Sequence, residues 1–337
     1  MNPKPSRSPW LFFMVTASLT LVSATVGDSR GRWEGDPLTS IEAIAGQQPR
    51  TYRAPWGDPD LQGTWSYGVL TPLERPAAFA NKELVTKEEA AALNEEAAKL
   101  EDRPTRPGDT GAYNQFWMDI RTVHRDRRTS LIVDPPDGRL PFKSEVAKER
   151  VARAEHLRQH PADSWLDRSL QERCLVYHGV PPVPSNYNNL WQILQTRDSV
   201  VILAENIHDV RIIPLDRRPH LGSAIRQWHG DSRGRWDGQT LVVETTNYRD
   251  RSAFPSASAT ASTSDQTRVI ERLTRRDDNS IDYEYVIEDP ALFSRPWTVT
   301  LPLTKTSDKI YEYACHEGNH AIPNILTGTR AQETASR

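Results

Sequence analysis

From Leu190 onward, hydrophobic and polar residues alternate in short runs, and turn residues separate most of these runs. Alternation is typical of strands with one buried face, because successive side chains of a strand point to opposite sides of the sheet. Tight turns such as Asp237-Gly238 favour antiparallel hairpins between consecutive strands. The runs predicted to be strands are 190–195, 199–205, 210–215, 240–248, 267–275, 281–288, 297–305 and 310–316.

Consecutive strands that are joined by short turns predict an up-and-down antiparallel sheet, and a sheet of this size usually curls and closes. We therefore expect a mainly β fold, a lipocalin-like barrel of about eight or more strands. Each predicted strand has one apolar, aromatic face and one polar face. The polar face points outward in most soluble barrels but inward in one that holds a polar ligand, and the sequence leaves both arrangements open.

The first half of the chain has helical signals instead. A capping box at Thr86-Lys87-Glu88-Glu89 predicts a helix that ends near Glu101. A narrow apolar stripe predicts a second helix over residues 144–159, which Pro161 follows. Between them, residues 116–133 are predicted to form two short strands. The two helices are expected to be accessories to the barrel.

Two other segments indicate how the ends of the barrel are closed. Gly63-Thr64-Trp65 is similar to the first strand of a lipocalin-type barrel, in which the tryptophan plugs one end. The proline-rich segment 179–184 belongs to a long connection. A connection of this length is usually either a lid or a plug, so we expect it to cover part of the barrel.

The N-terminus has the pattern of a secretory signal peptide: Lys4 and Arg7, an apolar run over 10–22, and small residues up to Ala24. The run is short for a transmembrane helix, and an uncleaved anchor is the alternative. We expect an exported protein, periplasmic or extracellular, without stable membrane insertion after cleavage. The expected organisation is a signal peptide (1–24), a polar, disordered lead-in (25–55), a single barrel domain (56–330) with a helical and proline-rich insert (about 86–188), and a tail (331–337).

Composition narrows the class of partner. The full chain has a net charge of −3. Without residues 1–24 it becomes −5, because 40 basic and 45 acidic residues remain. An acidic balance argues against nucleic-acid binding, which requires a basic face. The 10 tryptophans exceed what the core of such a chain needs. Because indole rings often line ligand sites, we expect a small-molecule partner.

Cys174 and Cys315 are the only cysteines in the sequence. In an exported protein two cysteines usually form a disulfide, so their Cα atoms are expected to lie within about 7 Å of each other. The alternative is a free catalytic thiol, but an exported thiol without a partner tends to oxidise.

The richest concentration of reactive groups is the motif Tyr-Glu-Tyr-Ala-Cys-His-Glu-Gly-Asn at 311–319. On a strand, Glu312 and His316 share one face, so the carboxylate could orient the imidazole as in a general base. Glu317 lies on the other face unless Gly318 turns the chain. The alternative is a structural histidine at the barrel rim. The candidate catalytic residues are His316, Glu312 and Glu317.

Metal and cofactor motifs are absent from the sequence. His316 and His320 are spaced as a possible ligand pair, but the chain has no cysteine pair or His-Glu-x-x-His motif with zinc spacing. It also lacks a glycine-rich phosphate loop, a dinucleotide fingerprint and a Gly-x-Ser-x-Gly motif. We therefore expect neither a metal nor a cofactor.

Arginines that alternate with aromatic residues are candidate ligand-binding groups. Planar guanidinium donors beside aromatic rings suit a carboxylate, a phosphate or sugar hydroxyls, although the same pattern also forms solvated cation–π surfaces. At the 205–211 segment, Arg211 is expected to pair with Asp209 and leave His208 facing a ligand. The predicted ligand-binding residues are His208, Arg211, Trp228, Arg233, Trp236, Arg295, Trp297 and Asn319.

Four segments together resemble a widespread, uncharacterised family of exported proteins from environmental bacteria. They are Asn-Leu-Trp-Gln-Ile at 189–193, the Arg- and Trp-rich run at 226–236, Arg-Pro-Trp-Thr at 295–298 and the motif at 311–319. The resemblance covers about residues 55–330 and implies a shared, lipocalin-like fold. It implies no particular activity or catalytic residue. His320 departs from the pattern, which has an aromatic residue there, and this weakens a metal site.

Two classes of function remain. The first is a binding protein that holds a polar or aromatic small molecule in the mouth of the barrel, which requires a cavity of a few hundred Å³. The second is an acid–base hydrolase or lyase for a sugar-like or phenolic substrate, with His316 as the base and Arg211 or Arg233 holding an anionic group. A purely structural envelope protein would have neither a cavity nor clustered polar groups.

Overall fold

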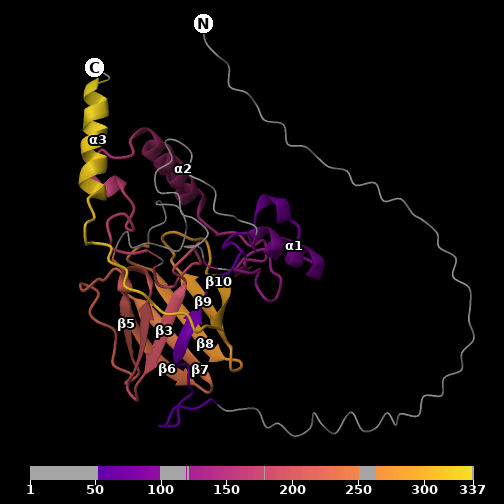
Figure 1. The fold of residues 1–337 in the computed structure, drawn as a ribbon. Helices are drawn as coiled ribbons and strands as arrows, with labels where there is room; N and C mark the ends of the chain where they lie inside the picture. The colour runs from indigo at the N-terminus through magenta and orange to yellow at the C-terminus, as the bar shows by residue number, and fades with distance from the viewer. Residues whose placement is uncertain (1–51, 99–118, 120, 178, 250–262, 336–337) are drawn as a thin grey trace, which may run out of the picture. The chain divides into compact units, whose positions relative to one another are not determined.

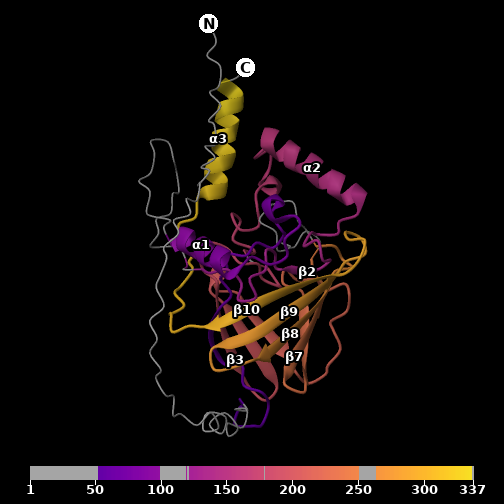
Figure 2. The ribbon, with the colours of Figure 1, turned by 90° about the vertical axis from the view of Figure 1, so that its right-hand side faces the viewer.

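The computed structural model of the protein describes residues 52–98, 119, 121–177, 179–249 and 263–335. The predicted signal peptide and residues 25–51 of the lead-in lie outside these residues. The described chain forms an antiparallel sheet whose neighbours run in the order β5-β4-β3-β1-β10-β9-β8-β7-β6, with β2 also paired to β10 (Figures 1 and 2). Its strands are β1 Gly63–Ser66, β2 Ile132–Asp134, β3 Leu190–Gln195, β4 Ser199–Ala204, β5 Val210–Pro214, β6 Asp231–Asp237, β7 Thr240–Thr246, β8 Arg268–Arg275, β9 Ser280–Glu288 and β10 Trp297–Lys305.

The two ends of this sheet, β5 and β6, come together through side chains. A Cβ atom added at Gly234 of β6 would lie 2.8 Å from Cγ2 of Ile213 in β5 and 2.7 Å from Cδ2 of Leu215. Only a glycine therefore allows the strands to approach this closely. The result is a nearly closed antiparallel barrel, which confirms the predicted fold class.

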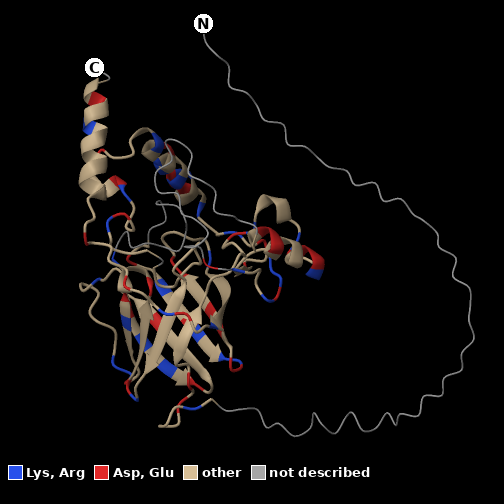
Figure 3. Cartoon of the chain, in the orientation of Figure 1, with Lys and Arg blue, Asp and Glu red and all other residues tan. Residues whose placement is uncertain are grey.

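The interior carries the apolar and aromatic face of each strand. In β9, Ile281, Tyr283, Tyr285 and Ile287 are buried, and the residues between them are partly exposed. In β10, the aromatic ring of Trp297 and its apolar successors point inward in the same way. Charges of both signs are interspersed over the strands and the connections (Figure 3). In β9 and β10 the polar faces therefore point outward, as in most soluble barrels.

One end of the barrel is closed by Trp65, as its Gly-x-Trp context predicts. The side chain is fully buried, and its Nε1 donates to the carbonyl oxygen of Leu61 at 2.9 Å. The guanidinium of Arg275 lies 5.4 Å from the centre of a Trp65 ring and 4.2 Å from that of Tyr52. This cation covers the aromatic plug from the outside.

The predicted strand at 310–316 is wrong, because residues 306–319 have no regular structure. Both sides of β10 are already occupied. β9 pairs along one side, while β1 and β2 pair along the other at Trp65↔Lys305 and Val299↔Ile132. A further strand after β10 therefore has no edge to join. β6, in contrast, is a strand that alternation does not predict, because glycine and arginine interrupt its apolar pattern.

The helices are α1 Lys87–Ala98, α2 Ser144–Gln159 and α3 Ala321–Ala335. The capping box of α1 is confirmed: the Glu89 amide donates to Thr86 Oγ1 at 3.2 Å, and the Thr86 amide donates to Glu89 Oε2 at 2.8 Å. α3 was not predicted and includes part of the expected tail at 331–337. Of the two strands expected within 116–133, the described residues contain only β2. None of the described helices combines the length and apolar character needed to cross a membrane.

The disulfide between Cys174 and Cys315 is confirmed. The two Cα atoms lie 5.7 Å apart, within the range that a disulfide requires. The bond connects residues separated by 141 positions, so it joins the insert to the irregular segment after β10.

Candidate functional site

The barrel interior contains a buried ion pair between Arg211 of β5 and Glu271 of β8. Arg211 Nη1 donates to Glu271 Oε1 at 2.9 Å, and Nη2 contacts Oε2. Glu271 is fully buried and also accepts from the Tyr283 hydroxyl at 2.7 Å. Burial opposes the charge of Arg211, but the Glu271 carboxylate outweighs it and raises the pKa of Arg211.

The expected pairing of Arg211 with Asp209 is therefore wrong. Residue 211 shares the inward face of β5 with Ile213, and the buried Glu271 carboxylate inside the barrel requires a cation there. Arg211 Nε also donates to Ser232 Oγ at 2.9 Å, and Nη2 donates to Thr245 Oγ1 at 2.7 Å. The side chains of this network occupy the barrel interior. Within it, the charge of the Arg211 guanidinium is neutralised by Glu271.

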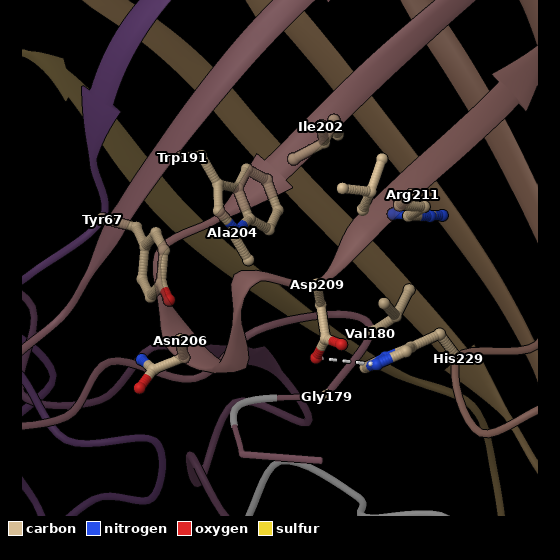
Figure 4. A pocket seen from close by; sticks show the side chains of 11 residues that line it. Tyr67, Gly179, Val180, Trp191, Ile202, Ala204, Asn206, Asp209, Arg211 and His229 are labelled. Atoms are coloured by element: carbon tan, nitrogen blue, oxygen red, sulfur yellow. Dashed lines mark hydrogen bonds and ion pairs between the residues drawn. The ribbon is translucent and has the colours of Figure 1, made fainter. Parts of the chain in front are cut away.

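At the barrel end where β3 begins and β4 ends, a pocket opens to solvent; we call it the mouth pocket (Figure 4). Its enclosed space is about 30 Å³, and the space that includes its open part is about 440 Å³. The enclosed part has room for only a few water molecules. The residues that give it its character are Tyr67, Trp191, Ile202, Asp209, Arg211 and His229.

The walls of the mouth pocket are aromatic and rigid. The ring centres of Tyr67 and Trp191 lie 5.4 Å apart, and Trp191 packs edge-on against Tyr283 at 5.6 Å. The proline-rich loop forms a further side, because the Tyr248 hydroxyl donates to the carbonyl oxygen of Val180 at 2.9 Å. Since Val180 is buried, this loop covers part of the barrel end.

A carboxylate–imidazole pair lies at the solvent side of the mouth pocket. Asp209 Oδ2 is 3.0 Å from His229 Nε2, and the two side chains are 31% and 27% exposed. Among the described residues, the buried Nδ1 of His229 has no hydrogen-bond partner. With Nε2 donating to the carboxylate, Nδ1 carries a lone pair. The Asp209 carboxylate, which is partly exposed, can accept hydrogen bonds from a ligand.

Local backbone geometry brings this pair together. Ile207 and His208 have positive φ angles of 56° and 45°, which make the sharp turn before Asp209. Gly230 follows His229 with a φ of 70°, and a Cβ there would lie 2.6 Å from Thr245 Cγ2. The glycine is required both for this conformation and for the close approach to β7.

Two acidic residues, Glu205 and Asp119, lie near Tyr67 of the mouth pocket. Burial, followed by the negative charge of Asp119, raises the pKa of the Glu205 carboxyl to about 7. Burial and the charges of Glu205 and Asp119 raise the pKa of the Tyr67 hydroxyl well above its usual range. Asp119 itself accepts from the Asn189 amide nitrogen at 3.1 Å. The surroundings of Tyr67 and Glu205 are therefore negatively charged.

Replacing Glu205 with glutamine is expected to remove a pH-dependent loss of stability. Because the pKa of Glu205 is higher in the folded state, its contribution is present below about pH 4.5 and is lost as the pH rises through about 7. At pH 8 we expect Glu205→Gln to be more stable than the wild type by about 2–3 kcal/mol, with little difference at pH 4.5. Urea denaturation at both pH values measures this. The exposed Glu317→Gln is the control, and a parallel response of both variants would contradict the prediction.

The predicted catalytic residues do not lie in the mouth pocket. Glu312, His316 and Glu317 are exposed on the irregular segment after β10. The argument that Glu312 and His316 share a strand face does not hold, because the strand is not formed. His208 lies near this segment, since its Nδ1 is 3.0 Å from the carbonyl oxygen of Tyr313.

Of the predicted ligand-binding residues, Arg211 alone is among the described residues that line the mouth pocket. The others are dispersed. Trp297 is fully buried in the core, Trp236 packs against the core, Trp228 lies 4.9 Å below the guanidinium of Arg249, Arg233 pairs with Asp231 at 2.6 Å, Arg295 pairs with Asp134 at 2.6 Å, and Asn319 Nδ2 contacts Cys174 Sγ at 3.1 Å. The structure thus does not assemble them into one site.

Sequence reasoning missed the residues that the mouth pocket does bring together. Glu205 and Asp209 belong to a segment singled out for its polar residues, and His229 belongs to the Arg- and Trp-rich run. Their approach depends on the meeting of β5 and β6, which no local pattern reports. Within the described residues, no group of three or more His, Cys, Asp or Glu side chains is placed to hold a metal ion.

Comparison with known proteins gives no information about the function of this site. No model of a protein family matches the chain, and no curated protein matches it. The function is therefore inferred from the mouth pocket itself.

Proposed function

We propose that the protein binds a small molecule in the mouth pocket. The observation that carries this proposal is the convergence of an aromatic wall, Tyr67 and Trp191, with the Asp209–His229 pair in a pocket that opens to solvent. Ligand sites typically combine apolar walls with a few placed polar groups in this way. The aromatic contacts on Trp191 and the hydrogen bond on Asp209 hold both parts in place before a ligand arrives.

The ligand occupies the mouth and not the barrel interior. Buried aromatic side chains and the Arg211–Glu271 network fill the interior. The enclosed space of about 30 Å³ is far below the few hundred Å³ of a cavity that surrounds a ligand, so a bound compound would rest mainly in the open mouth. Because its enclosed part is small, the ligand keeps part of its surface in water, and we expect moderate affinity.

Export is part of the same proposal. The N-terminal pattern is that of a signal peptide, and the Cys174–Cys315 disulfide is typical of proteins that fold in an oxidising compartment. A periplasmic or extracellular location would place the mouth pocket in contact with small compounds from the environment.

The proposal is tested by identifying what the protein carries. Native mass spectrometry of the protein, purified from its own source extract, is expected to reveal a bound small molecule. Ala204→Leu adds bulk on the inward face of β4 beside the pocket and should weaken binding of that compound at least tenfold, equal to about 1.4 kcal/mol. Val201→Leu, which points outward from the same strand, is the matched control. Equal binding by the two variants would place the ligand elsewhere, and the absence of any bound compound would contradict the proposal.

A further inference from the structure

The basic group of the mouth pocket is not available to a ligand. Arg211 is the only Lys or Arg among the described residues that line it. Its guanidinium makes four hydrogen bonds to protein groups, two of them to the buried Glu271 carboxylate. A guanidinium has five N–H donors, so little hydrogen-bonding capacity remains, and its charge is already balanced. A carboxylate or phosphate ligand would find no free cation there.

The acidic groups, in contrast, remain unbalanced. Asp209 lines the pocket, and the imidazole of His229 occupies one of the several acceptor positions of its carboxylate. Asp119 and Asp308 both act on the neighbouring Glu205 as negative charges and raise its pKa. Arg121 is a cation that interacts with Asp119 and offsets part of its charge, but Asp119 and Asp308 still act on Glu205 as negative charges. The field at Glu205 is thus negative.

The aromatic wall also favours a positively charged ligand over an anion. The faces of tryptophan and tyrosine rings attract a cation within about 6 Å of the ring centre, by roughly 0.5–2 kcal/mol. Trp191 is 4% exposed and Tyr67 1%, so only the margins of these rings face the mouth pocket, and a group that touches them there loses part of its hydration. In such surroundings an ammonium group between a carboxylate and an aromatic face is more strongly held than on an open surface.

We propose that the mouth pocket selects a positively charged aromatic compound, an arylalkylamine, over uncharged and anionic compounds with the same ring. The inference rests on the proposed binding function and adds the class of ligand. The ring lies at the pocket-facing margin of the Tyr67–Trp191 wall, and the ammonium group donates to the Asp209 carboxylate.

Three compounds with one phenol ring separate charge from shape. Isothermal titration calorimetry at pH 8 and low salt is expected to show tyramine, a cation, binding at least tenfold more tightly than uncharged 4-ethylphenol, with the anion 4-hydroxyphenylacetate weakest. Raising the salt concentration should weaken tyramine alone. Lowering the pH to 6 should also reduce its advantage, because Glu205 near the pocket gains a proton.

The variant Asp209→Asn tests whether the preference for the cation depends on the Asp209 carboxylate. It should reduce tyramine affinity about tenfold and leave 4-ethylphenol affinity unchanged, which also shows that the variant is folded. The exposed Asp216→Asn is the matched control. Equal affinities for the three compounds, or a preference for the anion, would overturn the charge preference while leaving the binding function intact if Ala204→Leu still blocks the site. No binding of any of them overturns the assigned class, and the proposed function then depends on the compound that co-purifies.

Discussion

Glu271→Gln is expected to lower the free energy of unfolding by about 3–5 kcal/mol, because it leaves the Arg211 guanidinium buried without its counter-charge. Glutamine keeps the shape of the side chain and an acceptor for the Tyr283 hydroxyl. The loss therefore reports the uncompensated charge and not a cavity. Guanidinium-chloride denaturation followed by far-ultraviolet circular dichroism measures it.

Two comparisons make this result specific. Glu284→Gln changes an outward residue of β9 and should alter stability by no more than about 0.5 kcal/mol. The double variant Arg211→Met with Glu271→Leu removes both charges and should recover a large part of the loss, since apolar residues often replace a buried ion pair without cost. A loss below about 1 kcal/mol in Glu271→Gln would show that the ion pair is not a major contributor to stability.

Removing the disulfide is the second change with a large expected effect. Replacing Cys174 and Cys315 together with serine should lower stability by about 3–5 kcal/mol, because the bond closes a loop of 141 residues and restricts the unfolded chain. Thermal unfolding of the wild type with and without a thiol reductant, beside the double variant, measures the effect. The reductant should lower the melting temperature of the wild type to that of the variant and should not change the variant. An unchanged wild type under reduction would contradict the prediction.

The barrel was largely predictable because its signals are local. Alternation places the aromatic residues of β9 on one face, and that face is the interior. The same signal failed at 310–316, where alternating residues occur but β1 and β2 already occupy the available side of β10. Alternation reports which side of a strand is apolar; it does not report whether an edge is free to pair with it.

The candidate site was not predictable for a related reason. Asp209 and His229 are joined by a hydrogen bond that exists only where the two ends of the sheet meet. The partner of Arg211 is equally non-local: Glu271 is 60 residues away in sequence, and the nearer Asp209 was the wrong choice. Of the two residues that form the aromatic wall, Tyr67 comes from the segment after β1 and Trp191 from β3. Sequence spacing favours near neighbours, whereas this site is made of distant ones.

The contacts between β5 and β6 close the barrel next to the mouth pocket. The two outermost strands are held across this gap by the Arg211–Ser232 and Asp209–His229 contacts and by the packing of Ile213 against Gly234. The barrel is thus a rolled sheet whose two outermost strands are joined by side-chain contacts, and the mouth pocket lies at one end of this row of contacts. A molecule bound between Asp209 and His229, as we propose, would touch both margins of the sheet, and its binding and the closure of the barrel would then favour each other by linkage.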